Sequence, residues 1–257
     1  MENKKSYIFL IIILAIYLVI ALVLKKTGIL DKKESYIVFS DQTIIRIEKN
    51  KLYTENDLDV LKEKKFDTYD YDEYLGKYNV KLDGKTYRVY DDKYNLIKFK
   101  NNFIGIYDPK NQTKINANKI ENLNEYDRLQ LNKIMNDKNL NTCTQFSKIE
   151  KKKLNNEKND KLYIYDIACD NLIDNDVFSI IYTSDEENYD ILKFNSVKKE
   201  KYYDSNSYYI EAILDFDNDK NDEIIIDTMI SSQNGIPERE IFKQEKNKYI
   251  KLSIEKE

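Results

Sequence analysis

The longest apolar run in the chain lies near its start, where an uncharged stretch extends from Tyr7 to Leu24 between pairs of lysines. A run of this length is sufficient to cross the hydrocarbon core of a bilayer as one helix. A lysine follows the run directly and no small-residue cleavage site is present, which favours an uncleaved signal anchor over a cleaved signal peptide. We therefore predict a signal anchor or transmembrane helix over residues 1–27, with residues 7–24 in the membrane, followed by a linker over residues 28–35.

Beyond the linker, apolar and polar residues alternate in short runs, the pattern typical of half-buried β-strands. Polar pairs that favour tight turns separate several of these runs, and Asp-Gly is a strong signal for a β-hairpin. Three hairpins follow from this pattern, with reversals at Lys49–Asn50, Asp83–Gly84 and Asn101–Asn102. The sequence thus predicts a meander of β-hairpins over residues 36–118.

The spacing of apolar residues becomes helical after Asn122, and either Asn122 or Asn124 is placed to cap the start of a helix. We predict a helical connector over residues 119–140 and a second β region over residues 141–257, where short strands resume. The predicted fold is an N-terminal transmembrane helix followed by a mainly-β domain, propeller- or sandwich-like, with one intervening helix. The pattern leaves open whether the two β regions share one hydrophobic core.

Composition narrows the range of functions. The net charge is -4, and acids and lysines are interspersed, so no basic stripe is present and we expect no nucleic-acid partner. The chain contains no histidine, which excludes Ser-His and Cys-His catalysis and every His-ligated zinc site. We do not expect an enzyme, although the many carboxylates leave a carboxylate-based hydrolase as an alternative.

The two cysteines, Cys143 and Cys169, fit no metal-ligand or redox motif. They form either a disulfide or a pair of buried free thiols. A disulfide requires an oxidising compartment. The lysine count around the apolar run slightly favours the opposite orientation, but the short N-terminal tail and the cysteines favour a domain outside the cytoplasm. We predict a single-pass cell-membrane protein whose C-terminal domain is extracytoplasmic.

One segment near the C-terminus carries oxygen ligands at alternate positions between two apolar strands. Its potential ligands are the side chains of Asp215, Asp217, Asp219 and Glu223 and the backbone carbonyl of Asn221. Calcium prefers six to eight such oxygens, so the spacing predicts a calcium (Ca²⁺) loop. An EF-hand is excluded because the twelfth loop position is apolar and the flanking segments are strands. The alternative is a solvated acidic turn.

This strand–loop–strand segment resembles the calcium loops of FG-GAP and VCBS-type repeats. The resemblance covers about residues 208–253, one four-stranded unit, and Asn218 and Lys220 stand where that family usually has glycine. The resemblance implies a structural calcium ion in a propeller-type unit of a membrane-anchored bacterial envelope protein.

Taken together, these patterns predict a membrane-tethered, extracytoplasmic binding or scaffolding module with a structural calcium loop. Its expected partners are the membrane, through residues 7–24, and an envelope protein or cell-wall component. An accessory or sensor subunit of a membrane complex is the main alternative, and an envelope hydrolase is a further one.

Overall fold

The computed structural model describes residues 34–256 apart from short gaps. Within that range the undescribed positions are 42, 49–50, 63, 71, 100–101, 110–112, 114, 116–119, 141–142, 173–175, 186, 199–205, 231–236 and 246–247. The predicted membrane segment, residues 7–24, and most of the predicted linker lie outside the described residues. Among the residues that are described, no helix is both long enough and apolar enough to cross a membrane.

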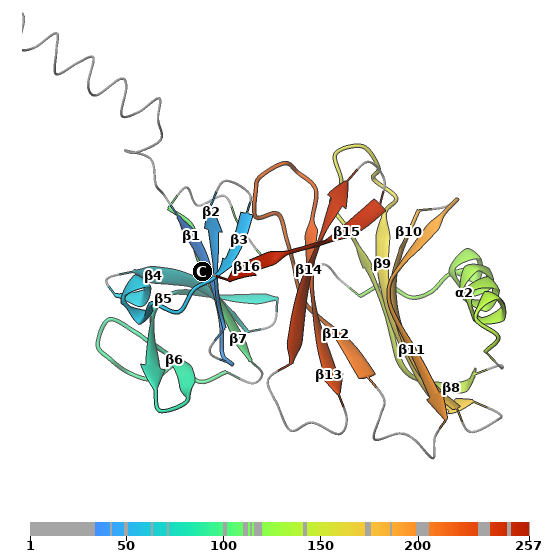
Figure 1. The fold of residues 1–257 in the computed structure, drawn as a ribbon, viewed down its shortest axis with the longest axis horizontal. Coiled ribbons are helices and arrows are strands. Elements are labelled where there is room, and N and C mark those ends of the chain that lie inside the picture. The colour runs from blue at the N-terminus through green and yellow to red at the C-terminus, as the bar shows by residue number, and fades with distance from the viewer. Residues whose placement is uncertain are drawn as a thin grey trace, which may run out of the picture.

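The described residues form three β-sheets that stand side by side and one α-helix that covers the outermost sheet (Figure 1). This arrangement confirms the mainly-β fold and the single helix between two β regions. We refer to the sheets, from left to right in Figure 1, as the N-terminal, middle and outer sheets.

The N-terminal sheet has eight strands in the order β16-β3-β2-β1-β7-β4-β5-β6. Its strands are β1 (Ser35–Phe39), β2 (Ile44–Glu48), β3 (Lys51–Thr54), β4 (Lys65–Asp70), β5 (Glu73–Asp83), β6 (Thr86–Tyr90), β7 (Phe103–Tyr107) and β16 (Ile254–Lys256). All neighbours are antiparallel except β16 and β3, which are parallel. A short 3-10 helix, η1 (Leu58–Leu61), precedes β4.

Two of the three predicted hairpins are present, namely β2–β3 and β5–β6, and the turn of the second contains Gly84 at φ 67. The third, with its reversal at Asn101–Asn102, is wrong. Strand β7 pairs with β1 and β4, while the described segment before it bonds back toward β6, through a bridge between Leu96 and Tyr90 and a bond from the Ile97 amide to the Val89 carbonyl. Four consecutive residues of β7 are buried, so this strand is covered on both faces at the centre of the sheet.

The middle and outer sheets are both four-stranded antiparallel meanders in which neighbours in sequence are neighbours in space. The outer sheet contains β8 (Cys143–Lys153), β9 (Tyr163–Leu172), β10 (Asp176–Ser184) and β11 (Tyr189–Lys198). The middle sheet contains β12 (Asn206–Leu214), β13 (Glu223–Ile230), β14 (Glu238–Glu245) and β15 (Lys248–Leu252). After β15 the chain crosses to the N-terminal sheet as β16, so the C-terminal segment joins two sheets (Figure 1).

The middle sheet is buried on both faces. Ile225 and Ile241 pack against residues of the N-terminal sheet such as Ile37 and Ile104 in one core cluster. On the opposite face, the side chains of β12–β15 form a second cluster with the outer sheet, which includes Ile164, Ile181, Ile210, Ile224 and Phe242. The β regions before and after the helix therefore share a core, which the sequence had left open.

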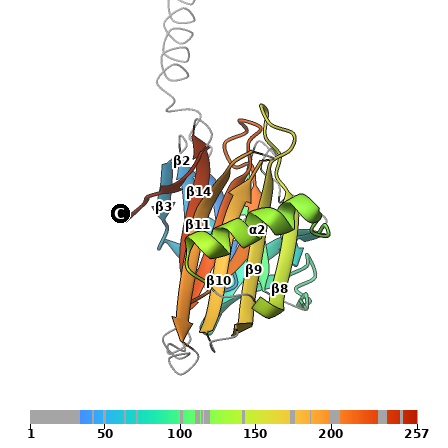
Figure 2. The same cartoon turned by 90° about the vertical axis from the view of Figure 1, so that its right-hand side faces the viewer.

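The single α-helix, α2 (Glu125–Asp137), lies across the outer face of the outer sheet (Figure 2). Asn124 caps it, as one of the two predicted candidates, and forms a capping box with Asp127. The Asp127 carboxylate also accepts hydrogen bonds from Lys151 Nζ at 2.8 Å and Tyr165 Oη at 2.7 Å. Because this acid is fully paired, it can be buried between the helix and the sheet.

Cys143 and Cys169 are joined by a disulfide between the neighbouring strands β8 and β9, with their Cα atoms 6.3 Å apart. Cys169 lies in the core between α2 and the outer sheet. Of the two alternatives for these cysteines, the structure therefore contains the disulfide. The bond closes a loop between positions 26 residues apart.

Removing this bond tests its contribution to the fold. We expect the Cys143→Ser, Cys169→Ser double variant to lose about 3–4 kcal/mol of unfolding free energy, because the cross-link restricts the unfolded chain. Denaturant unfolding at neutral pH, with and without reductant, measures the loss. Reductant should destabilise the unaltered protein by the same amount and leave the double variant unchanged. Equal stability of the oxidised protein and the double variant would contradict the expectation.

Candidate metal-binding site

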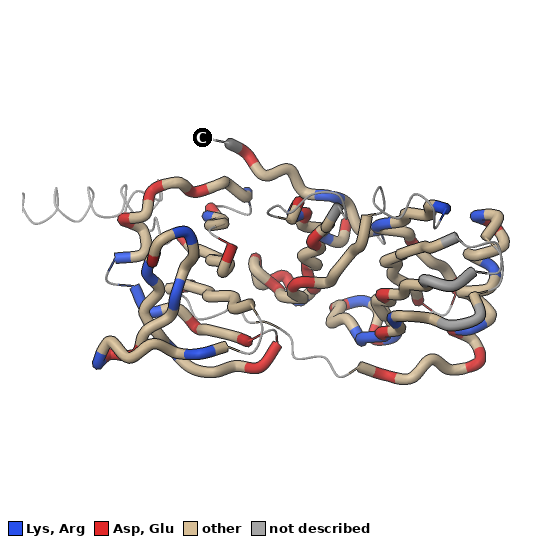
Figure 3. Tube along the Cα trace, turned by 90° about the horizontal axis from the view of Figure 1, so that it is seen from below, with Lys and Arg blue, Asp and Glu red and all other residues tan. Residues whose placement is uncertain are grey.

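Lys and Arg are interspersed with Asp and Glu along all three sheets (Figure 3). Charge alone therefore does not mark a site. Buried charges do, because a carboxylate removed from water is costly unless a cation or several hydrogen-bond donors balance it. Among the described residues, two groups of acids that meet this criterion lie on the middle sheet.

The first group lies in the acidic loop, residues 215–223, between β12 and β13. The two strands pair as far as Leu214 and Glu223, so the loop closes directly at the end of the ladder. Glu223 is fully buried, and its Oε2 accepts a hydrogen bond from the Phe216 amide at 2.9 Å. Burial raises the pKa of Glu223 to about 9, although the bond from Phe216 acts in the opposite direction.

Backbone hydrogen bonds to Asp215 shape this loop. Its carboxylate accepts from the amides of Asp219 at 3.1 Å and Lys220 at 2.9 Å. Asn218 and Lys220 have φ values of 60° and 68°, in the left-handed region that is strained for residues with a side chain. The resulting tight turn returns the chain to β13 within a few residues.

Three of the five predicted ligands come together. Asp215, Asp217 and Glu223 each offer a carboxylate oxygen, and these atoms lie within 4.8 Å of one another. Asp217 Oδ1 and Glu223 Oε1 are buried and have no hydrogen-bond partner in the described part of the protein. This acidic triad (Asp215, Asp217 and Glu223) can hold a metal ion.

The fourth predicted carboxylate ligand, Asp219, is placed differently. Asp219 lies outside the triad, and its Oδ1 accepts from the amide of Asn221 at 2.9 Å. At Asn221 the predicted ligand is the backbone carbonyl, which stays a prediction. The Asn221 side chain points to the adjacent loop, where its Oδ1 accepts from the amide of Glu157 at 3.1 Å. That loop, residues 154–162, connects β8 to β9 in the outer sheet as the acidic loop connects β12 to β13.

Sequence reasoning missed Lys243, which projects from β14 into the group of acids. Its Nζ donates to Asp217 and to Asp219 Oδ2, the latter at 2.9 Å, and lies 3.8 Å from Glu223 Oε1. Burial alone lowers the pKa of Lys243, but the carboxylates raise it overall. Arg239, Ile241 and Lys243 occupy alternate positions of β14, so their side chains lie on one face of that strand. The sequence does not show that this face meets the acidic loop, because the pairing of β13 with β14 brings Lys243 there.

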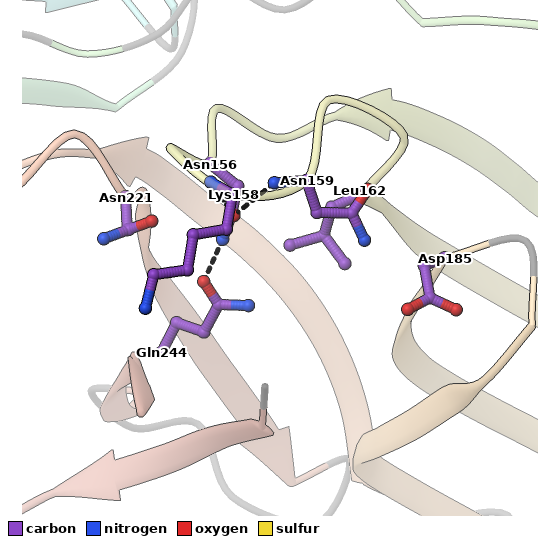
Figure 4. A pocket seen from close by; sticks show the side chains of 7 residues that line it. All are labelled: Asn156, Lys158, Asn159, Leu162, Asp185, Asn221 and Gln244. Carbon is purple, nitrogen blue, oxygen red and sulfur yellow. Dashed lines mark hydrogen bonds between the residues drawn. The ribbon is translucent and has the colours of Figure 1, made fainter. Parts of the chain in front are cut away.

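A pocket of about 430 Å³ lies beside the acidic loop (Figure 4). It is lined by Asn156, Lys158, Asn159, Leu162, Asp185, Asn221 and Gln244. Asn156 donates to Gln244, and its Oδ1 accepts from the amides of Lys158 and Asn159 at 2.9 and 2.8 Å. These bonds order the loop of residues 154–162 and join it to β14 of the middle sheet.

The second group of carboxylates lines a pocket of about 410 Å³ where the three sheets meet. Arg239 Nε and Nη2 donate to Asp227 at 2.8 and 2.6 Å, and Nη2 also donates to Asp41 at 3.0 Å. The nearby Glu211 has no such partner in the described part of the chain, and burial, followed by the charge of Asp227, raises its pKa to about 7. In the sequence, the signal for this cluster is Asp227, an acid that directly follows three isoleucines in β13.

Comparison with protein-family models, with curated proteins and with solved structures found no match for this chain. Its function therefore has to be argued from the geometry of these sites.

The raised pKa of Glu211 predicts a pH-dependent loss of stability. The unfolded carboxyl ionises near its ordinary pKa of 4.5 and the folded one near 7, so folding becomes less favourable as the pH rises between these values. We expect the Glu211→Gln variant to gain roughly 2–3 kcal/mol relative to the unaltered protein between pH 4.5 and 8. Denaturant unfolding across this range, with Glu245→Gln at an exposed position as the control, measures the difference. Parallel pH profiles for Glu211→Gln and the unaltered protein would contradict it.

Proposed function

We propose that this chain is a membrane-tethered, extracytoplasmic binding or scaffolding module whose acidic loop binds a structural calcium ion. The observation that carries the metal site is the pair of buried carboxylate oxygens, Asp217 Oδ1 and Glu223 Oε1, that have no hydrogen-bond partner among the described residues. Unpartnered carboxylate oxygens beside a third carboxylate are costly in a protein interior and become favourable when a cation binds them.

Calcium fits this donor set better than a transition metal. The triad offers only carboxylate oxygens, which hard cations prefer, and no His or Cys ligand is present in it. Extracellular modules bind calcium weakly and rely on the high concentration outside the cell. Asn218 and Lys220, at the positions where FG-GAP and VCBS-type loops usually have glycine, adopt the left-handed backbone that glycine adopts most readily.

The location of the loop supports a structural role for the ion. Asn155 of the adjacent loop and Asp222 exchange two hydrogen bonds, from Asn155 N to Asp222 Oδ2 at 2.6 Å and from Asp222 N to Asn155 O at 3.0 Å. Tyr249 of β15 donates to the Asp222 carbonyl at 3.0 Å. An ion bound by the triad would therefore stabilise the contact between the middle and outer sheets. We propose an envelope protein or a cell-wall component as the partner of the resulting rigid module.

Calcium binding is tested by thermal unfolding of the full-length protein in detergent, without reductant. In millimolar calcium we expect the midpoint to rise by roughly 5–10 °C above its value in EDTA, if free calcium is about 100 times the dissociation constant. Glu223→Gln keeps the shape of the side chain and removes its charge, so it should abolish the shift. Asp160→Asn, at an exposed acid of the adjacent loop, should keep it. Equal midpoints of the unaltered protein in calcium and EDTA would contradict calcium binding. The loop would then be an acidic turn whose charges are balanced by Lys243.

Membrane attachment and orientation need a separate test. We expect the full-length chain to remain in the membrane fraction after alkaline extraction, because a helix over residues 7–24 would bury its apolar side chains in lipid. Deletion of residues 7–24 should release the protein into the soluble fraction. Protease added to intact cells that express the full chain should digest the C-terminal domain. Protection of that domain until the cells are lysed would place it in the cytoplasm and contradict the proposal.

A further inference from the structure

The ammonium group of Lys243 contacts the same carboxylates that a metal ion would need. Its Nζ contacts Asp217, which belongs to the acidic triad, and Asp219, which the sequence had also predicted as a ligand. Glu223 Oε1, one of the two triad oxygens without a hydrogen-bond partner among the described residues, lies 3.8 Å from the same nitrogen. An ammonium ion and a divalent cation cannot both occupy this space, because they repel each other and require the same oxygens.

The strand register places Lys243 there. Phe242 of β14 pairs with Ile224 of β13, so the following residue, Lys243, comes to lie beside Glu223. The Lys243 side chain is 18% exposed, whereas those of Asp217 and Glu223 are 1% and 0% exposed. Lysine has a flexible stem, and its charged end can move toward water while the strand remains in place. The carboxylates have no comparable freedom.

We propose that Lys243 is a tethered counter-cation that occupies the acidic loop when no metal is bound and leaves it when calcium binds. This inference rests on the proposed function and specifies how the same site is regulated. The Lys243 ammonium balances the buried acids of the metal-free protein, so the loop stays closed without calcium. In return, calcium has to displace the hydrogen bonds of Lys243, which lowers its affinity.

Another lysine of the loop provides a matched control. Lys220 is adjacent in sequence to the predicted ligands, but its side chain is 74% exposed and its Nζ pairs with Glu157 at 3.2 Å on the outside of the loop. Removing the charge of either lysine changes the net charge of the protein equally. Only Lys243 competes directly for the oxygens of the triad.

The test is isothermal titration of calcium chloride into the full-length protein in detergent. We expect Lys243→Met to bind calcium roughly tenfold more tightly than the unaltered protein, because two charge-assisted hydrogen bonds no longer have to be broken. Lys243→Arg keeps the competing charge and should bind no more tightly than the unaltered protein. Lys220→Met should differ from the unaltered protein by less than a factor of about two, since exposed ion pairs contribute little.

A second measurement shows whether the variants fold. In EDTA, Lys243→Met should unfold at a lower temperature than the unaltered protein because its buried acids have lost their counter-cation, and calcium should raise its midpoint by more. Lys243→Gln, which is also uncharged, should show the same tighter binding and replaces the Met variant if that variant does not fold.

The outcomes separate the inference from the proposed function. Equal calcium affinities of the unaltered protein, Lys243→Met and Lys243→Gln would overturn the role of Lys243 and leave calcium binding intact. Binding by the uncharged variants alone would support competition by Lys243 but would overturn calcium binding by the natural protein. Absence of binding by all of these proteins would overturn both.

Discussion

Burial of the middle sheet on both faces is the constraint on which the rest of the structure depends. An antiparallel sheet commonly leaves one face to water, but here Ile224, Ile225 and Ile226 are exposed by no more than 1%. Ile225 faces the N-terminal sheet, and its two neighbours face the outer sheet. Each outer layer is therefore required to complete a core that the middle sheet begins. A polar side chain in the buried part of this sheet must find its partners within the protein.

Strand β14 meets this requirement at two places. Arg239 pairs with Asp227 and Asp41 where the three sheets meet, and its guanidinium carbon lies 3.6 Å from the centre of the Phe39 ring. Lys243 lies four residues further along the same face of β14 and pairs with Asp217 and Asp219 of the acidic loop. Ile241 lies between them and packs into the core. One face of a single strand thus supplies the cation of each polar site and the apolar contact between them, so the two sites are joined through the same element.

This arrangement explains how so acidic a loop can close a buried sheet. Among the described residues, Asp215 accepts from backbone amides, and Asp217 and Asp219 accept from Lys243. Glu223 accepts from one backbone amide, and Lys243 Nζ is 3.8 Å away from its other oxygen. Glu223 is consequently a fully buried acid with little compensation, and burial raises its pKa to about 9. The proposed calcium ion and the proposed role of Lys243 both follow from that imbalance.

The sequence by itself determined the local structure. Polar turn pairs identified two hairpins, an Asn placed the cap of α2, and alternate acids identified the loop, because each signal depends on residues close together in the chain. Tertiary structure alone decided the position of β7 between β1 and β4, the shared core and the approach of Lys243 to the triad. These features depend on which distant strands pair and in which register. That choice is made by burying apolar faces on both sides of a sheet, and a local pattern does not contain it.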